Sequence, residues 1–265
     1  MRPSKRERRL EIGVLYGFRA LMVLLVANYH IWQQSWLPQR FTLFGQSYSF
    51  DFLTRSSYLF VDGMMLLSGF LLYLPYARQT VEGTPAPGPG RFYWKRALRI
   101  IPSYLAAVLL ALCLFALPQG AYPSRGALVW DVLAHLTFTF PFWPQTYLYT
   151  PLNGALWTIA VEMQFYLLFP LLARAAQKRP ALTLSLMAAA GWAYRFCVYR
   201  FAADTSLLIN QLPSFLDVYA LGMLGALGYC RAQAPAAGLG PRARRALQWA
   251  CAAAFAVGCV CVCQL

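Results

Sequence analysis

Two residues that could take part in chemistry, Arg19 and His30, lie in the first long apolar stretch of the chain. They are eleven positions apart, which in an α-helix places them within about 20° of the same face and about 16 Å apart along the axis. Each has an ordinary explanation: Arg19 could extend its charged end to the membrane surface, and His30 could lie at the interface beside Trp32 and Trp36. Their shared face favours a functional pair, a permanent cation and a titratable imidazole.

Two carboxylates, Asp62 and Glu162, lie in later apolar stretches. Even on the lenient insertion scale, an ionisable residue at the centre of a membrane helix costs about 2.5–3.5 kcal/mol, so each needs a partner or a function. A lone carboxylate could be a hydrogen bonder in packing, but a histidine within reach favours a histidine–carboxylate pair. Such a pair orients the ring and fixes its tautomer. We therefore predict that His30 is a general base, oriented by Glu162 or Asp62.

Arg96 and Arg99 are three positions apart at the start of the third apolar stretch. Basic residues at this position commonly do no more than anchor the helix end on the cytoplasmic side. A guanidinium group also binds phosphate through two parallel hydrogen bonds. The spacing therefore allows a phosphate clamp as well as an anchor.

The elements that must hold these residues are membrane helices. The chain of 265 residues is 59% hydrophobic and 12% charged, with a mean hydropathy of +0.47. A soluble domain carries roughly a quarter charged residues. We predict an all-α polytopic membrane protein, a single domain over residues 1–265, whose spans have about 20 residues each. The seven predicted spans are residues 13–36, 58–76, 97–117, 155–173, 181–201, 211–230 and 246–265.

The basic residues set the predicted orientation. Positively charged residues favour the cytoplasmic side of a membrane protein. Seventeen of the 23 Lys and Arg residues lie in four segments, residues 1–11, 77–99, 174–180 and 231–245. All four segments are cytoplasmic if residues 127–143 form a re-entrant or outer-face segment and not a span. We expect an inner-membrane protein with a cytoplasmic N-terminus, whose first apolar stretch is a retained span and not a signal peptide.

Two other partner classes are disfavoured. A net charge of +14 would suggest nucleic acid in a soluble protein, but here the basic residues lie in loops and at span ends, where topology requires them. The seven cysteines contain no Cys-x-x-Cys motif and lie in or beside apolar stretches, where Cys behaves as a small hydrophobe. We expect no nucleic acid, no metal and no disulfide; the Cys-x-Cys-x-Cys run near the C-terminus is a weak reason for zinc.

Five motifs in order resemble the acyltransferase-3 family of integral-membrane O-acyltransferases. Arg19 and His30 match its Arg, ten residues, His signature, and the stretch FVDGMMLLSGF matches a pattern that ends in Ser-Gly-Phe. The stretch FYWKRALRIIP matches a basic pattern that includes Arg96 and Arg99. Two further motifs, in the fourth and sixth stretches, match at Trp157, Glu162, Gln164, Phe165, Tyr166 and Pro170, and at Pro213, Phe215 and Gly222.

The resemblance spans residues 17 to about 228 and implies the rest of the functional prediction. The family has about ten spans, so we expect this chain to end about three spans early. It uses an acyl-CoA donor, often acetyl-CoA, as a substrate, and we expect no permanently bound cofactor. Its acceptor is a hydroxyl of a carbohydrate or a similar compound; O-antigen, exopolysaccharide, peptidoglycan and small secondary metabolites are all compatible. Two departures, Ala20 after the Arg and Gly63 beside Asp62, do not touch the predicted chemistry.

The predicted mechanism places acyl-CoA at the cytoplasmic side, with Arg96 and Arg99 at its phosphates and Arg19 further along. His30 removes the proton from the acceptor hydroxyl, and Tyr166 or Ser68 stabilises the oxyanion. The other histidine, His135, lies outside every motif, so we expect His135→Ala to be much milder than His30→Ala. Two other functions use the same buried charges: a transporter with a proton or substrate path, and a non-catalytic membrane scaffold or sensor.

Overall fold

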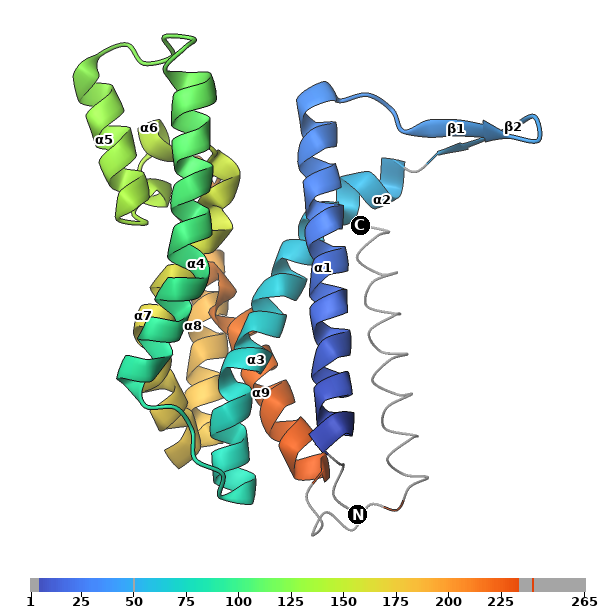
Figure 1. The fold of residues 1–265 in the computed structure, drawn as a ribbon, viewed down its shortest axis with the longest axis vertical. Helices are drawn as coiled ribbons and strands as arrows, with labels where there is room; N and C mark the ends of the chain where they lie inside the picture. The colour runs from blue at the N-terminus through green and yellow to red at the C-terminus, as the bar shows by residue number, and fades with distance from the viewer. Residues whose placement is uncertain (1–4, 50, 234–239, 241–265) are drawn as a thin grey trace.

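The structure is a computed structural model that describes residues 5–49, 51–233 and 240 (Figure 1). Its α-helices are α1 (Lys5–Ser35), α2 (Asp51–Ser56), α3 (Phe60–Glu82), α4 (Pro89–Ala111), α5 (Arg125–Leu136), α6 (Pro144–Tyr147), α7 (Trp157–Lys178), α8 (Pro180–Phe201) and α9 (Leu216–Gln233). Short 3-10 helices are η1 (Ser57–Leu59), η3 (Phe140–Phe142), η4 (Gly154–Leu156) and η5 (Leu212–Phe215), and η2 (Leu112–Ala116) is a π-helix that extends α4. The two strands are β1 (Arg40–Leu43) and β2 (Gln46–Ser49).

Six described helical segments are long and apolar enough to cross a membrane: Gly13–Ser35, Asp51–Glu82, Pro89–Ala116, Gly154–Lys178, Pro180–Phe201 and Leu212–Gln233. They coincide with the first six predicted spans, so the all-α polytopic membrane class is confirmed. The seventh predicted span, residues 246–265, lies outside the described residues. Helix α5 has 12 residues, about 18 Å, which is too short for a hydrocarbon core of about 30 Å. This agrees with the prediction that residues 127–143 do not span.

Helices α3 and α9 make the closest helix contact in the described bundle, and glycine permits it. A Cβ atom on Gly69 of α3 would lie 2.6 Å from the backbone oxygen of Tyr219, and one on Gly222 of α9 would collide with the backbone of Leu66. Tyr219 is fully buried and stacks on Phe165 of α7, with ring centroids 3.7 Å apart. The buried core is therefore formed by α3, α7 and α9, and α3 and α7 carry the polar residues described below.

Glycine and proline residues mark several of the helix ends. Gly83, at a φ of 71°, ends α3 in the left-handed conformation that glycine tolerates best. Proline occupies the first turn of α4 and of α8, where its missing N–H is no loss. Helix α4 begins at Pro89, eight residues before the predicted third span, so Arg96 and Arg99 lie inside a helix. Their side chains are therefore held on a regular helical surface and not on a loop.

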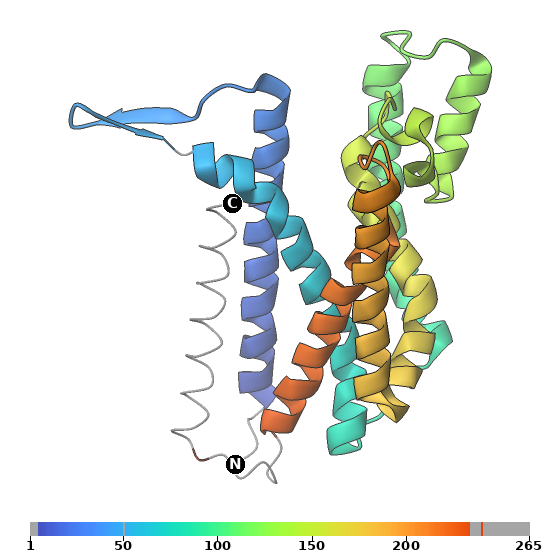
Figure 2. The same ribbon diagram turned by 180° about the vertical axis from the view of Figure 1, so that it is seen from behind.

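The β-hairpin is a feature that the all-α prediction did not contain. Phe41 and Tyr48 pair across β1 and β2 and stack at 5.3 Å, and the turn residues Phe44 and Gly45 have φ angles of 51° and 75°. Positive φ at both positions is the conformation that a two-residue hairpin turn requires. The hairpin extends sideways from one end of the bundle, and α5 and α6 lie at that same end (Figures 1 and 2). We call this the hairpin end, and the end with the α7–α8 connection the opposite end.

Candidate active site

Glu162 of α7 is the centre of a buried polar cluster. Its Oε1 atom accepts a hydrogen bond from the Ser68 hydroxyl of α3 at 2.7 Å and from the Tyr166 hydroxyl one turn along α7 at 2.6 Å. Ser68 and Tyr166 are buried, and Glu162 is 9% exposed. Two hydroxyl donors on one carboxylate oxygen offset the cost of taking that group out of water. Tyr166 reaches Glu162 because it lies one turn further along the same helix, and Ser68 reaches it because α3 packs against α7.

Arg19 of α1 completes this cluster. Its Nη2 atom lies 3.5 Å from Glu162 Oε1, and its side chain is 24% exposed. A charged arginine inside a membrane helix requires a partner of this kind. Within the described residues, no other side chain or backbone group accepts a hydrogen bond from Arg19. Its remaining N–H groups are available for a ligand.

Arg96 reaches the same place from α4. Its guanidinium carbon lies 5.6 Å from the ring centroid of Phe92 and 5.7 Å from that of Tyr166, both within cation–π range. Its buried Nε atom has no hydrogen-bond partner within the described residues. Arg99, one turn further along α4, is exposed. The structure therefore separates the two arginines that the sequence treated as a pair.

His30 is not paired with a carboxylate, which corrects the predicted arrangement. Arg19 occupies the position on α1 that faces Glu162, and His30 lies three helical turns away, about 16 Å along the axis. No hydrogen bond joins His30 to Glu162, to Asp62 or to any other described residue. Its ring is half-buried and makes an edge contact with Tyr29 at 5.4 Å. His30 therefore lies towards the hairpin end, and neither ring nitrogen has a hydrogen-bond partner among the described residues.

A second buried charge pair was missed by the sequence analysis. Arg195 of α8 donates to both carboxylate oxygens of Asp217 on α9, at 2.8 and 2.5 Å, and also to the backbone oxygen of Ser214. Asp62 lies within electrostatic range of Arg195 and Asp217 and not beside His30. Opposite charges in two consecutive apolar stretches, residues 181–201 and 211–230, were the available signal.

The cluster around Glu162 therefore combines one carboxylate, two hydroxyl groups and two cations. The guanidinium groups of Arg19 and Arg96 both act electrostatically on the Tyr166 hydroxyl. Two arginines against one carboxylate leave a net positive charge, which suits an anionic or strongly polar ligand. Among the residues that the structure describes, no group of three or more His, Cys, Asp or Glu side chains is arranged to hold a metal ion.

Comparison with known proteins identifies the family. The family model for the acyltransferase domain of the acyltransferase-3 family matches residues 14–263. The chain belongs to the acyltransferase-3 family. It is 29% identical over 193 residues to the acyltransferase MdmB of Streptomyces mycarofaciens, an alignment that covers 72% of this chain and 46% of that protein. The chain thus spans about half the length of the curated relative that it matches. No solved structure matches it significantly.

Membership confirms the resemblance on which the sequence analysis relied. Four of the five acyltransferase-3 motifs lie in or beside the first four predicted spans, and the structure brings one residue of each of these four to the Glu162 cluster. These residues are Arg19, Ser68, Arg96 and Glu162. His30 and Arg99 belong to the same motifs and lie outside the cluster. The motif residues therefore lie along α1 and α4 as well as at the Glu162 carboxylate.

Proposed function

We propose that the protein transfers an acyl group, preferably acetyl, from acyl-CoA to a hydroxyl group of a carbohydrate or cell-envelope glycan. The observation that carries this proposal is the meeting of Arg19, Ser68, Glu162 and Tyr166 at one buried point, with Arg96 against Tyr166. Membership of an acyltransferase family supports the reaction type. The net positive charge of the cluster supports a donor that carries phosphates.

The two sides of the membrane follow from the distribution of basic residues. We place the protein in the inner membrane, with its N-terminus and the opposite end of the bundle in the cytoplasm, because segments 77–99 and 174–180 are basic and lie at that end. The hairpin end then faces outwards. Acyl-CoA enters from the cytoplasm, and the acceptor reaches His30 from the outside.

The donor follows the face of α1 that carries both motif residues. Arg99 and Arg96 bind the phosphates near the start of α4, and the free N–H groups of Arg19 bind the polar pantetheine arm. An extended arm carries the thioester along α1 towards His30, which bridges the separation of about 16 Å. Ser68 and Tyr166 donate their hydroxyl protons to Glu162, so in this proposal they hold the carboxylate that orients Arg19. In the proposal this role replaces the oxyanion stabilisation that the sequence suggested for Tyr166 or Ser68.

The reaction needs one base. His30 takes the proton of the acceptor hydroxyl as that oxygen attacks the thioester carbonyl carbon. The C–S bond then breaks, an ester is formed, and the leaving thiolate of CoA takes the proton from His30. No proton is left over, so His30 returns to its starting state after each transfer.

Thermal unfolding of the purified protein with acetyl-CoA tests this function. A ligand present at 100 times its dissociation constant stabilises the folded state by about 2.7 kcal/mol, so the unfolding temperature should rise with acetyl-CoA concentration. The rise should be much smaller for Arg96→Ala. An unfolding temperature that acetyl-CoA does not change would instead support a transporter or a non-catalytic membrane protein. Glycan mass spectrometry of a deletion strain then identifies the acceptor by its lost acyl group.

A further inference from the structure

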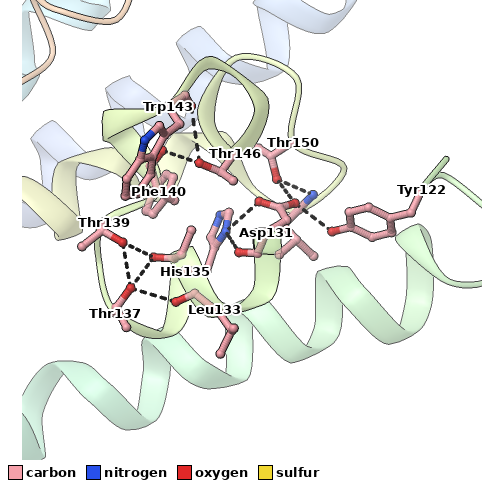
Figure 3. Close-up of polar contacts among 12 residues, drawn as sticks. Tyr122, Asp131, Leu133, His135, Thr137, Thr139, Phe140, Trp143, Thr146 and Thr150 are labelled. Atoms are coloured by element: carbon pink, nitrogen blue, oxygen red, sulfur yellow. Dashed lines mark hydrogen bonds and ion pairs between the residues drawn. The ribbon is translucent and has the colours of Figure 1, made fainter. Parts of the chain in front are cut away.

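A histidine–carboxylate pair lies at the hairpin end, in the segment from α5 to η4. His135 and Asp131 are one turn apart on α5, and His135 Nδ1 lies 2.9 Å from the Asp131 backbone oxygen and 3.2 Å from its Oδ1 atom (Figure 3). Both neighbouring atoms are acceptors, so Nδ1 carries the proton and donates it. The pair is part of a larger network and takes no part in the reaction described above.

The other oxygen of Asp131 ties the pair to two connecting segments. Asp131 Oδ2 accepts from the Tyr122 hydroxyl at 2.8 Å and from the Thr150 hydroxyl at 2.7 Å (Figure 3). Burial, together with the hydrogen bond to Asp131, raises the pKa of Tyr122, so its hydroxyl remains a donor at neutral pH. Asp131 therefore connects the segment before α5 with the segment that leads into α7.

His135 is held more firmly than a surface histidine. It is fully buried and stacks on Phe140, with ring centroids 4.1 Å apart and planes 7° from parallel. Its backbone oxygen accepts from the Tyr104 hydroxyl of α4 at 2.8 Å. Its Nε2 atom has no partner within the described residues. Burying the Nε2 atom without a partner costs free energy that an apolar side chain at this position would not cost. The presence of a histidine here therefore indicates that its Nδ1 hydrogen bond is needed.

A short chain of bonds leads from this pair to the Glu162 site. The Thr150 hydroxyl, which Asp131 holds, also accepts from the backbone N–H of Leu152 at 3.0 Å. Asn153 follows and caps η4 through the backbone N–H of Ala155 at 3.1 Å. Helix α7 begins directly after η4, and Glu162 lies five residues into it, about 7.5 Å along its axis. Thr150 and Asn153 therefore hold the segment that leads into α7.

We propose that His135 and Asp131 are positioning residues for the acyl-transfer site: through Thr150 they fix the start of α7, and with it the place of Glu162 opposite Arg19. The proposal rests on the acyl-transfer function given above. It assigns no contact with substrate to His135, whose ring is buried. His135 acts through Nδ1, which donates to the Asp131 backbone oxygen and lies 3.2 Å from Asp131 Oδ1, an atom without a hydrogen-bond partner among the described residues.

Two amide substitutions at position 135 distinguish the contribution of Nδ1 from that of Nε2. An Asn side chain can place its N–H donor where Nδ1 lies, whereas a Gln side chain places it where Nε2 lies. His135→Asn should therefore keep the network, and His135→Gln and His135→Leu should break it. Thr150→Val removes the connecting hydroxyl with little change of shape. Thr137→Val is the matched control. The Thr137 hydroxyl bonds to the Leu133 backbone oxygen and to the Thr139 hydroxyl, and neither partner lies in the segment that leads into α7 (Figure 3).

Hydrogen exchange of backbone amides in the purified protein measures the start of α7 without any substrate. We expect His135→Gln and Thr150→Val to raise exchange in residues 154–162 about tenfold or more, with α8 unchanged and with His135→Asn and Thr137→Val close to the parent. Transfer should fall in the same two variants, since a misplacement of about 1 Å can cost about 10²-fold in rate. Exchange at α7 is independent of acyl transfer, so a failure of the proposed function, seen as no stabilisation of the parent by acetyl-CoA, is a separate result. The proposal is overturned if His135→Gln and not His135→Asn resembles the parent, or if Thr150→Val exchanges no faster than Thr137→Val.

Discussion

Arg19 Nη2 lies 3.5 Å from Glu162 Oε1, although the two residues are 143 positions apart in the chain. One charge comes from α1 and the other from α7, and each would be unfavourable alone in hydrocarbon. The pair is also asymmetric, since two hydroxyl groups share the same Glu162 oxygen while Arg19 has one partner among the described residues. Glu162 is thus held in place by two hydroxyl donors, whereas Arg19 has N–H groups that could bind a ligand.

Glu162→Gln should lower transfer strongly while the protein remains inserted. Gln keeps an oxygen acceptor for Ser68 and Tyr166 but removes the charge that orients Arg19, and a group in a charged hydrogen bond typically contributes about 1.5–3 kcal/mol. Transfer should therefore fall about tenfold or more. Residues that act as one unit are not additive, so Glu162→Gln should add little in an Arg19→Ala background. Fully additive losses in this double-mutant cycle would show that the two residues act independently.

Arg96→Ala and Arg99→Ala should differ in their effect on the acyl-CoA donor. Arg96 is half-buried against Phe92 and Tyr166, and a charge-assisted phosphate contact there is worth about 1.5–3 kcal/mol, or roughly tenfold or more in donor KM. Arg99 is exposed, and an exposed ionic contact is worth about 1 kcal/mol or less. Initial rates at varied acyl-CoA concentration and two salt concentrations measure both variants. Equal donor KM values for Arg96→Ala and the parent would leave Arg96 only an anchoring role.

The sequence predicted those parts of the fold that depend on the local length and hydropathy of a segment. Membrane spans must be long and apolar, so six of them could be located from composition alone. The hairpin was missed because its turn residue Phe44 adopts a positive φ angle, which side chains other than glycine seldom do. Helix α4 begins at Pro89, before the predicted span of residues 97–117, because helix formation in the polar segment before the span does not depend on hydropathy.

The site was predicted only in part, because pairing across the bundle depends on packing. Charge in hydrocarbon identified Arg19, Asp62 and Glu162, but not which carboxylate each cation would meet. The sequence paired His30 with Glu162 or Asp62, and in the structure Arg19 is the α1 residue that contacts Glu162. His135 is fully buried although no sequence motif marks it, and the expectation that His135→Ala is much milder than His30→Ala stays a prediction.

The Arg195–Asp217 pair predicts a stability effect. Removing one partner of a fully buried ion pair leaves an uncompensated charge and typically costs about 3–5 kcal/mol, and we expect a smaller cost here because Arg195 is only half-buried. Asp217→Ala should therefore lower the unfolding temperature of the purified protein markedly, because Arg195 keeps only the Ser214 backbone oxygen. The double variant Arg195→Leu with Asp217→Leu should recover much of that loss, since two apolar residues need no partner. A double variant less stable than Asp217→Ala would mean that the pair contributes more than charge compensation.

Cysteine labelling tests the orientation of the bundle. In a background without the seven native cysteines, Arg179→Cys at the α7–α8 connection should resist a membrane-impermeant maleimide in intact cells and react after lysis. Gln46→Cys in the hairpin is the control and should react in intact cells. Both positions are exposed, so access to the reagent depends on the side of the membrane. Labelling of Arg179→Cys from outside would reverse the orientation and place the donor entrance at the hairpin end.

His30→Ala should abolish transfer while the protein remains inserted and folded. Ala is more favourable than His in a membrane helix, so the substitution does not impair insertion of α1. What is lost is the imidazole that acts as the general base, and a general base supplies about 10²–10⁴-fold in rate. Its half-buried ring bonds to no described residue, so little folding stability should be lost with it.

Ile31→Ala is the matched control for His30→Ala, because Ile31 is the next residue on α1 and is 69% exposed. Transfer to the native acceptor should be measured for both variants at equal membrane abundance, together with stabilisation by acetyl-CoA. His30→Ala should keep the stabilisation, since the donor contacts lie at Arg19 and Arg96, and should lose only the transfer. If His30→Ala retains near-normal transfer, the proton of the acceptor is taken by another group and the general-base role of His30 is wrong. If both transfer and stabilisation disappear, His30 belongs to the donor site, and the separation of about 16 Å from Arg19 marks the length of that site along α1.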